Sequence, residues 1–344
     1  MIKLNNFGIL IKVFISNFCL KINKKKISLF YKIFLIILFI YSTSIESKKS
    51  IYSNIINVAY AFDNNYHYIT HVSMKSIMIN QNYDTFINFY LLVSNITQEQ
   101  KNVINRISLE HRNCKITFFD MGNKFKEFRI PNEVWSTANF YRIILQDLLK
   151  DEKKILYLDV DTLIYKDLTK IYNYNISGKY FIGMLEYRDN SFFQKYNVNF
   201  NNFINTGVIL CNLDELRKGN ISKKIEEFII KNNNNSKFPV NDPTNYITHS
   251  KNGYFSPEYV TIGFCNEFEP FKYYLGFKMK INITKVIESY KDPYIYHFII
   301  HIKPWRGISN YYGKVCIDPI TRFYEIARKT HYYYEILKTF QIYK

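Results

Sequence analysis

KILYLDVD, residues 154–161, is the stretch that decides the fold of this 344-residue chain. Its first five residues are mostly apolar without strict alternation, which is typical of a buried strand in a parallel sheet. Asp159 and Asp161 follow at once, and open α/β sheets bind their ligands beyond the carboxyl ends of the strands. Two carboxylates at such a place favour a bound divalent cation with oxygen ligands. The alternative is an aspartate pair that caps the following turn.

The segments on either side of this strand alternate between strand and helix patterns. Thr97 and Gln100 have the spacing of a capping box, which predicts a helix that runs to His111. This alternation predicts an α/β fold with a mostly parallel sheet, helices on both faces and a single domain. Strands are expected at 55–62, 86–93, 114–119, 154–158, 180–185 and 206–213, and helices at 69–79, 97–111, 136–149 and 214–230.

The first 50 residues differ in composition from the rest of the chain. They hold nine lysines and one acid, Glu46, so nine minus one gives +8 of the formal net charge of +17. An apolar run at 27–41 follows the basic stretch and precedes the polar residues 42–44. This order predicts a signal peptide or signal anchor in residues 1–50 with a cytoplasmic N-terminus. The alternative is an interfacial helix on a cytosolic protein.

The rest of the chain carries a charge of +9 (17 minus 8), scattered along the sequence. It lacks the arginine-rich stripe of a nucleic-acid-binding protein, so we expect no nucleic-acid partner. The five cysteines show no C-x-x-C spacing, which argues against a structural zinc site.

Five short motifs occur in an order that resembles a known family. They are Ala61-Phe62-Asp63-Asn64-Asn65-Tyr66, Ala138-Asn139-Phe140-Tyr141-Arg142, Tyr157-Leu158-Asp159-Val160-Asp161, Asn205-Thr206-Gly207, and His297-Phe298 followed by Lys303-Pro304-Trp305. Over about residues 55–307 the chain resembles glycosyltransferase family 8, whose members include lipopolysaccharide galactosyl- and glucosyltransferases and glycogenin. The resemblance implies a Rossmann-like GT-A fold and a retaining enzyme that uses a nucleotide sugar, usually a UDP-hexose.

The family's metal motif coincides with the aspartate pair described above. The resemblance implies that Asp159, Asp161 and His297 hold Mn²⁺, or Mg²⁺, against the donor's pyrophosphate. An imidazole among the ligands favours Mn²⁺, and His301 is a rival for the histidine position. Lys303 is expected to add a positive charge on the same phosphate oxygens.

The other motifs are expected to hold the rest of the donor. Asp63, Asn65 and Tyr66 follow the first strand, where the family binds the nucleotide base, and Tyr66 is able to stack on it. The resemblance implies that Gly207 also lies in the donor site. Arg142, Asn205 and Asp242 are the candidates for catalytic contacts with the donor sugar.

The chain departs from the family's pattern at two positions. Asp242 is followed by Pro243 where the family has Gln, and Ile300 stands where it has Gly. We therefore keep two interpretations. The first is a metal-dependent transferase that moves glucose or galactose to a glycan, lipid-linked or protein acceptor. The second is a catalytically weak GT-A domain that binds a nucleotide sugar or glycan.

The expected organisation has three parts. Residues 1–50 form the signal peptide or anchor, 51–310 the catalytic domain, and 311–344 an aromatic and basic C-terminal tail. The anchor predicts a membrane-associated protein facing a Golgi-type lumen, in keeping with sequons at Asn95, Asn175, Asn220, Asn234 and Asn282. The alternative is the cytoplasmic face of a bacterial inner membrane.

Overall fold

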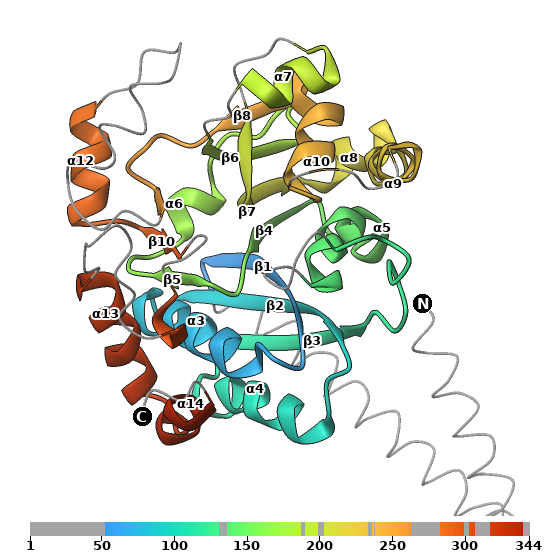
Figure 1. Cartoon of the computed structure of the whole chain (residues 1–344). Coiled ribbons are helices and arrows are strands. Elements are labelled where there is room, and N and C mark those ends of the chain that lie inside the picture. Colours follow the sequence, from blue (N-terminus) through green and yellow to red (C-terminus); the bar gives the residue numbers. More distant parts are fainter. Residues whose placement is uncertain are drawn as a thin grey trace, which may run out of the picture. The chain divides into compact units, whose positions relative to one another are not determined.

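A computed structural model describes most of the chain from residue 52 onward (Figure 1). The described residues are 52–130, 136–186, 190–198, 203–232, 236, 238–262, 283–298, 303–306 and 317–339. The apolar run at 27–41, Ile300 and His301 lie outside these ranges. None of the helices in the described part is both long and apolar enough to cross a membrane.

A seven-stranded sheet with the order β3-β2-β1-β4-β7-β6-β8 forms the centre of the fold. The first four strands of this order are mutually parallel, whereas β7 runs antiparallel to both β4 and β6. The predicted mostly parallel α/β sheet is therefore confirmed. Its strands are β1 (Asn54–Asp63), β2 (Thr85–Ser94), β3 (Cys114–Asp120), β4 (Lys154–Leu158), β6 (Phe181–Leu185), β7 (Ile204–Asn212) and β8 (Asn252–Tyr254).

Helices cover both faces of this sheet, as the alternation predicts. Along β1, Ile56, Val58 and Tyr60 join one hydrophobic cluster, while Ala59 and Ala61 join another. Successive side chains of a strand point to opposite faces, so these two clusters are the two cores of the sheet. The first contains α3 (His67–Asn80) and α4 (Gln98–Glu110), and the second contains α8 (Leu213–Gly219) and α9 (Ile221–Lys231).

A second, three-stranded sheet lies beyond the end of β4 and has the order β5-β10-β9. Strand β10 (Ile295–His297) pairs antiparallel with β5 (Thr162–Ile164) and parallel with β9 (Val260–Ile262). The register sets His297 opposite Thr162, the residue that directly follows Asp161. This small sheet therefore brings the histidine to the aspartate pair. Helix α12 (Ile283–Lys291) precedes β10.

Two predicted helices differ from the structure. Residues 136–149 form a 3₁₀ helix, η2 (Thr137–Ile144), followed by the short α5 (Leu145–Leu148). Beta-branched and aromatic residues weaken an α-helix here, and 3₁₀ geometry aligns i with i+3, so that Arg142 hydrogen-bonds Asn139. The predicted helix at 214–230 breaks into α8 and α9 because Asn220 is left-handed, with φ of 50°, a conformation that asparagine tolerates.

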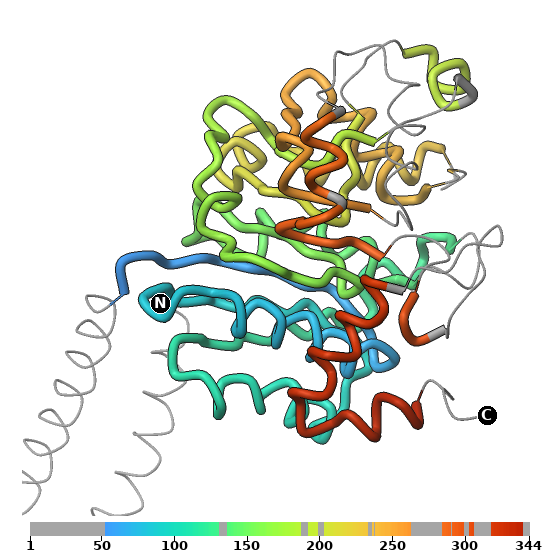
Figure 2. The backbone as a smooth tube through the Cα atoms, turned by 90° about the vertical axis from the view of Figure 1, so that its left-hand side faces the viewer, coloured from blue at the N-terminus to red at the C-terminus, as the bar shows by residue number. Residues whose placement is uncertain are grey.

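The remaining elements lie on connections or near the C-terminus. They are α6 (Thr169–Tyr172), α7 (Asn190–Tyr196), α10 (Asn241–Thr248), η3 (His249–Lys251), η4 (Pro304–Arg306), α13 (Ile317–Arg328) and α14 (Tyr333–Thr339). The last two helices, α13 and α14, pack against α3. Phe323 and Ile326 of α13 and Ile336 of α14 share a hydrophobic cluster with Ile69 and Val72 of α3. Figure 2 shows these red helices against the cyan N-terminal elements.

Candidate active site

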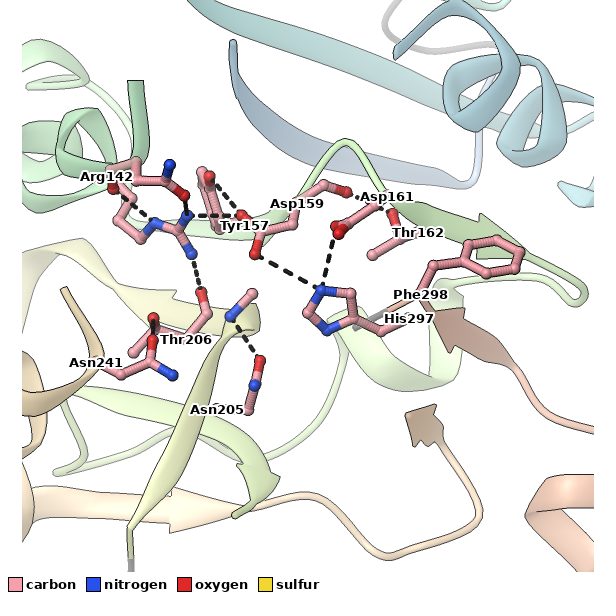
Figure 3. A network of polar contacts seen from close by, with 12 residues as sticks. Arg142, Tyr157, Asp159, Asp161, Thr162, Asn205, Thr206, Asn241, His297 and Phe298 are labelled. Atoms are coloured by element: carbon pink, nitrogen blue, oxygen red, sulfur yellow. Dashed lines mark hydrogen bonds and ion pairs between the residues drawn. The ribbon is translucent and has the colours of Figure 1, made fainter. Parts of the chain in front are cut away.

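Three metal-ligand side chains converge where β4 ends and the small sheet begins (Figure 3). The Nε2 atom of His297 lies 3.1 Å from Oδ1 of Asp161 and 3.6 Å from Oδ2 of Asp159. One ligand atom from each residue lies within 4.8 Å of the other two. The histidine is buried, and the side chains of Asp159 and Asp161 are 24% and 15% exposed.

Backbone hydrogen bonds fix the two aspartates in place. The N–H of Asp159 donates to the carbonyl of Gly207 at 2.7 Å, which ties the end of β4 to β7. The N–H of Phe298 donates to the carbonyl of Asp161 at 2.8 Å, which ties the small sheet to the same loop. Each aspartate is therefore held by a strand from a distant part of the sequence.

The second oxygen of Asp159 is held by two donors. Arg142 approaches Oδ1 with Nη2 at 2.6 Å, and the hydroxyl of Tyr157 donates to the same oxygen at 3.0 Å. Oδ2 is thereby left on the side of His297 (Figure 3). Groups that orient a ligating carboxylate in this way raise metal affinity.

Arg142 is buried, and its guanidinium group is held by polar contacts with surrounding residues. Its side chain is 6% exposed, and its Nη1 donates to the carbonyl of Thr206 at 2.7 Å. The guanidinium also lies 4.4 Å from the centre of the Tyr157 ring. Burial lowers the pKa of Arg142, but the charges of Asp159 and Asp161, the Tyr157 hydroxyl and the hydrogen bond to Asp159 together outweigh this, so the net shift is upward. The arginine is thus a permanent cation beside the cluster.

Lys303 provides the second cation. Its ammonium group pairs with Oδ2 of Asp161 and donates to the carbonyl of Phe298. Burial raises the pKa of Asp161, but the charge of Lys303 and the hydrogen-bonding contacts with Lys303 and His297 together more than offset this, so the pKa lies below its ordinary value. Asp161 is therefore ionised at neutral pH, as a metal ligand must be.

The donor set fits a divalent cation. Two carboxylate oxygens and one imidazole nitrogen suit Mn²⁺, and also Mg²⁺ if water completes its shell. The aspartates and the two cations beside them sum to zero charge, so an added ion does not meet a net positive site. Among the described residues this is the single cluster of three such side chains.

Residue 207 must be glycine because the His297 and Asp159 side chains lie very close to its Cα atom. A Cβ atom at this position would collide with the His297 ring and the Asp159 carboxylate. Its N–H donates to Oδ1 of Asn205 at 2.8 Å, and the Asn205 amide donates to Glu186 at 2.8 Å. The predicted Asn-x-Gly motif therefore borders the cluster directly.

The profile of glycosyl transferase family 8 matches residues 57–309, which is more than half of the chain. This chain belongs to that family. A Haemophilus influenzae protein is 27% identical over 195 residues, covering 55% of this chain and 59% of that protein. The lipopolysaccharide 1,2-glucosyltransferase of Escherichia coli K12 is 23% identical over 283 residues, covering 80% of this chain and 78% of that protein.

General stress protein A of Bacillus subtilis is 23% identical over 178 residues, covering 51% of this chain and 62% of that protein. The chain thus spans about three fifths of the Haemophilus and Bacillus relatives. The galactosyltransferase LgtC, crystallised with donor and acceptor sugar analogues, superposes with a TM-score of 0.68 at 19% identity, over 80% of this chain and 96% of LgtC. The family-8 chain therefore has the GT-A fold.

Asp242 lies apart from the cluster in this family-8 domain. It is buried, and its Oδ2 accepts from the Ser236 hydroxyl at 2.5 Å and the Phe238 N–H at 3.3 Å. The carboxylate therefore closes the turn before α10. Its neighbour Asn241 reaches the network of Figure 3, accepting from Thr206 and donating to Glu186. A catalytic role for Asp242 stays a prediction.

The predicted base-binding residues lie at the same edge of the sheet as the cluster. Strand β1 is parallel to β4 and ends at Asp63, whose carboxylate accepts the N–H of Asn65 at 3.0 Å. Tyr66 precedes α3 and packs against two of the hydrophobic clusters. Asp63 and Asn65 keep exposed surface. Their contact with a nucleotide stays a prediction.

Two residues of the network were missed from the sequence. Glu186 directly follows β6, just as the aspartates follow β4, and it accepts from both Asn205 and Asn241. A carboxylate right after an apolar strand is a signal that could have found it. Tyr157 carries no such signal, because inside a strand it reads as an ordinary core residue.

Proposed function

We propose that this protein transfers a hexose, glucose or galactose, from a UDP-sugar to a glycan acceptor, with retention of anomeric configuration and with a divalent metal. Family membership and the GT-A fold support transfer from a nucleotide sugar. The observation that carries the metal dependence is the cluster of Asp159, Asp161 and His297.

Charge balance explains how the site would receive the donor. Arg142 and Lys303 neutralise Asp159 and Asp161 in pairs. A divalent ion would therefore give the site a net charge of +2, which matches the two negative charges of a pyrophosphate. When bound, the ion supplies Lewis-acid stabilisation of the charge that develops on the leaving diphosphate.

The chain's own residues have distinct tasks in this proposal. Arg142 and Tyr157 orient Asp159, and Lys303 places a cation where phosphate oxygens gather charge as the sugar leaves. Asn205 and Glu186 lie beside the cluster and offer an amide and a carboxylate to the sugar hydroxyls. Asp63, Asn65 and Tyr66 hold the base at the end of β1.

The test is hydrolysis and transfer of UDP-glucose and UDP-galactose by the purified full-length protein, with Mn²⁺, Mg²⁺ or EDTA. We expect turnover that requires metal and that Asp161→Asn nearly abolishes. Asp214→Asn is the matched control, because Asp214 forms a helix-surface ion pair with Arg217. Metal-independent turnover would refute the role of the cluster. Tight donor binding without turnover would instead support the weak GT-A domain.

We also propose that residues 1–50 attach the catalytic domain to a membrane. Basic residues followed by the apolar run at 27–41 support this. In sealed vesicles, a lumenal domain resists added protease until detergent is supplied, and its sequons shift in mobility after deglycosylation. Digestion without detergent, and without such a shift, would place the domain on the cytoplasmic face and leave the catalytic proposal unaffected.

A further inference from the structure

A cavity of about 480 Å³ opens beside the small sheet, between α13 and the segment that joins α12 to β10. Tyr165, directly after β5, and Tyr296, in the middle of β10, form part of its wall. Thr321 and Arg322 of α13 line the other side. Its volume lies within the range of about 300–1,000 Å³ that small-molecule sites occupy. Figure 1 shows α12 and α13 on the same side of the molecule, with β5 and β10 between them.

The cavity and the metal-ligand cluster use opposite faces of the same strand. His297 points to the aspartates, so Tyr296, its neighbour in β10, points to the other face. The hydrophobic clusters agree, because Tyr296 and Leu163 belong to one and Ile295 and Ile164 to the other. A ligand in the cavity would therefore not touch the reacting sugar.

The charges around the cavity are balanced. Lys291 and Arg322 bring two positive charges, and Asp318 and Glu325 bring two negative ones. Arg322 already pairs with Glu325 at 3.1 Å and lies 5.5 Å from the centre of the Tyr165 ring. The lining therefore has no excess positive charge that would attract an anion. A metal is also disfavoured, since the one cluster of three ligand side chains among the described residues is at the other site.

A neutral molecule rich in hydroxyl groups fits this lining. Each sugar hydroxyl both donates and accepts, so it can bind a carboxylate and a guanidinium at once. Thr321 adds a hydroxyl, and the rings of Pro293 and Pro319 add apolar wall for the C–H faces of a sugar. The side chains of Arg322 and Glu325 are 46% and 45% exposed, so a ligand can reach them from solvent.

We propose that this cavity is a non-catalytic binding site for one or more neutral sugar units of a glycan. This inference rests on the proposed function, because the glycan acceptor of the transferase is the ligand that brings such units to the protein. The site would hold a part of the acceptor that lies away from the reacting sugar, and so raise its local concentration at the metal cluster.

The experiment measures binding of maltotriose, cellotriose and lactose to the full-length protein by saturation-transfer NMR, with glucose 6-phosphate as an anionic probe. Thr321→Trp places a bulky side chain at the cavity wall and narrows the cavity, and Arg328→Trp adds the same side chain to an exposed position of α13 outside the lining. We expect Thr321→Trp to abolish binding of the neutral sugars and Arg322→Ala to weaken it about tenfold or more. Arg328→Trp and the cluster variant Asp161→Asn should bind like wild type.

Each result decides between the two sites. Binding that is lost in Asp161→Asn and kept in Thr321→Trp would place the sugar in the active site and overturn the inference, as would no binding by wild type. Binding of glucose 6-phosphate alone would overturn the assigned chemistry. Thr321→Trp should hydrolyse UDP-glucose at the wild-type rate, which also shows that it folds. If Thr321→Trp abolishes sugar binding but the wild-type protein shows no donor turnover, the proposed function is refuted and the cavity site still stands.

Discussion

Replacing Tyr157 with phenylalanine removes a single oxygen from the shell around the metal-ligand cluster. The lost group is the hydroxyl that donates to Oδ1 of Asp159 at 3.0 Å. A hydrogen bond to a charged group contributes about 1.5–3 kcal/mol, and each ~1.4 kcal/mol is a factor of ten in affinity. Arg142 still holds the same oxygen at 2.6 Å. We therefore expect Mn²⁺ to bind Tyr157→Phe about 10- to 100-fold more weakly, in line with other residues that orient metal ligands.

Titration of the protein with Mn²⁺, followed by the loss of the free-ion EPR signal, measures this affinity directly. The matched control is Tyr90→Phe, because Tyr90 also donates to a carboxylate, that of Glu152, at 2.6 Å, away from the cluster. We expect wild-type Mn²⁺ affinity in this control. Equal affinity of Tyr157→Phe and wild type would refute the orienting role of the hydroxyl. An equal loss in both variants would show that the effect is not local.

Three further predictions follow from named contacts. Gly207→Ala should lower transfer about 100-fold or more, because its Cβ displaces the His297 ring and the Asp159 carboxylate; steady-state kinetics checks this. Lys303→Ala should lower kcat more than donor affinity, and an effect on affinity alone in binding and turnover assays would contradict it. Burial lowers the pKa of His71 to about 4, so its stability contribution is complete above pH 6.5 and is lost as pH falls toward 4. Wild type should lose about 2 kcal/mol more stability than His71→Met between pH 7 and 5, measured by urea unfolding.

Six of the seven strands of the main sheet were predictable because each is a short apolar run of its own. Strand β8, with the sequence NGY, and the three short strands of the small sheet were not predicted. The predicted bounds agree with the structure to within about two residues. Strand direction was not predictable in the same way. The apolar pattern of 206–213 does not say that β7 runs antiparallel to β4, since a strand buried on both faces reads alike in either direction.

The residues of the candidate site also divide into those that the sequence predicts and those that it does not. Asp159 and Asp161 were predictable because they follow an apolar strand directly, whereas His297 and Lys303 needed the family's spacing. The second donor to Asp159 was not predictable, because the aromatic ring of Tyr157 satisfies the strand pattern whether or not its hydroxyl has a task. The break at Asn220 was missed because helical periodicity continues on both sides of one left-handed residue.

The pairing of Asp161 with Lys303 joins residues that are 142 positions apart in the chain. Asp159 differs, because its partner Arg142 comes before it in the sequence. During synthesis at roughly 5–20 residues per second, the ammonium group that neutralises Asp161 is made roughly 7 to 28 seconds after the carboxylate. Burying a carboxylate without its counter-charge is costly. The ribosome-bound chain should therefore keep the end of β4 open until Lys303 has emerged, and a product terminated before that residue should remain a substrate for cellular proteases.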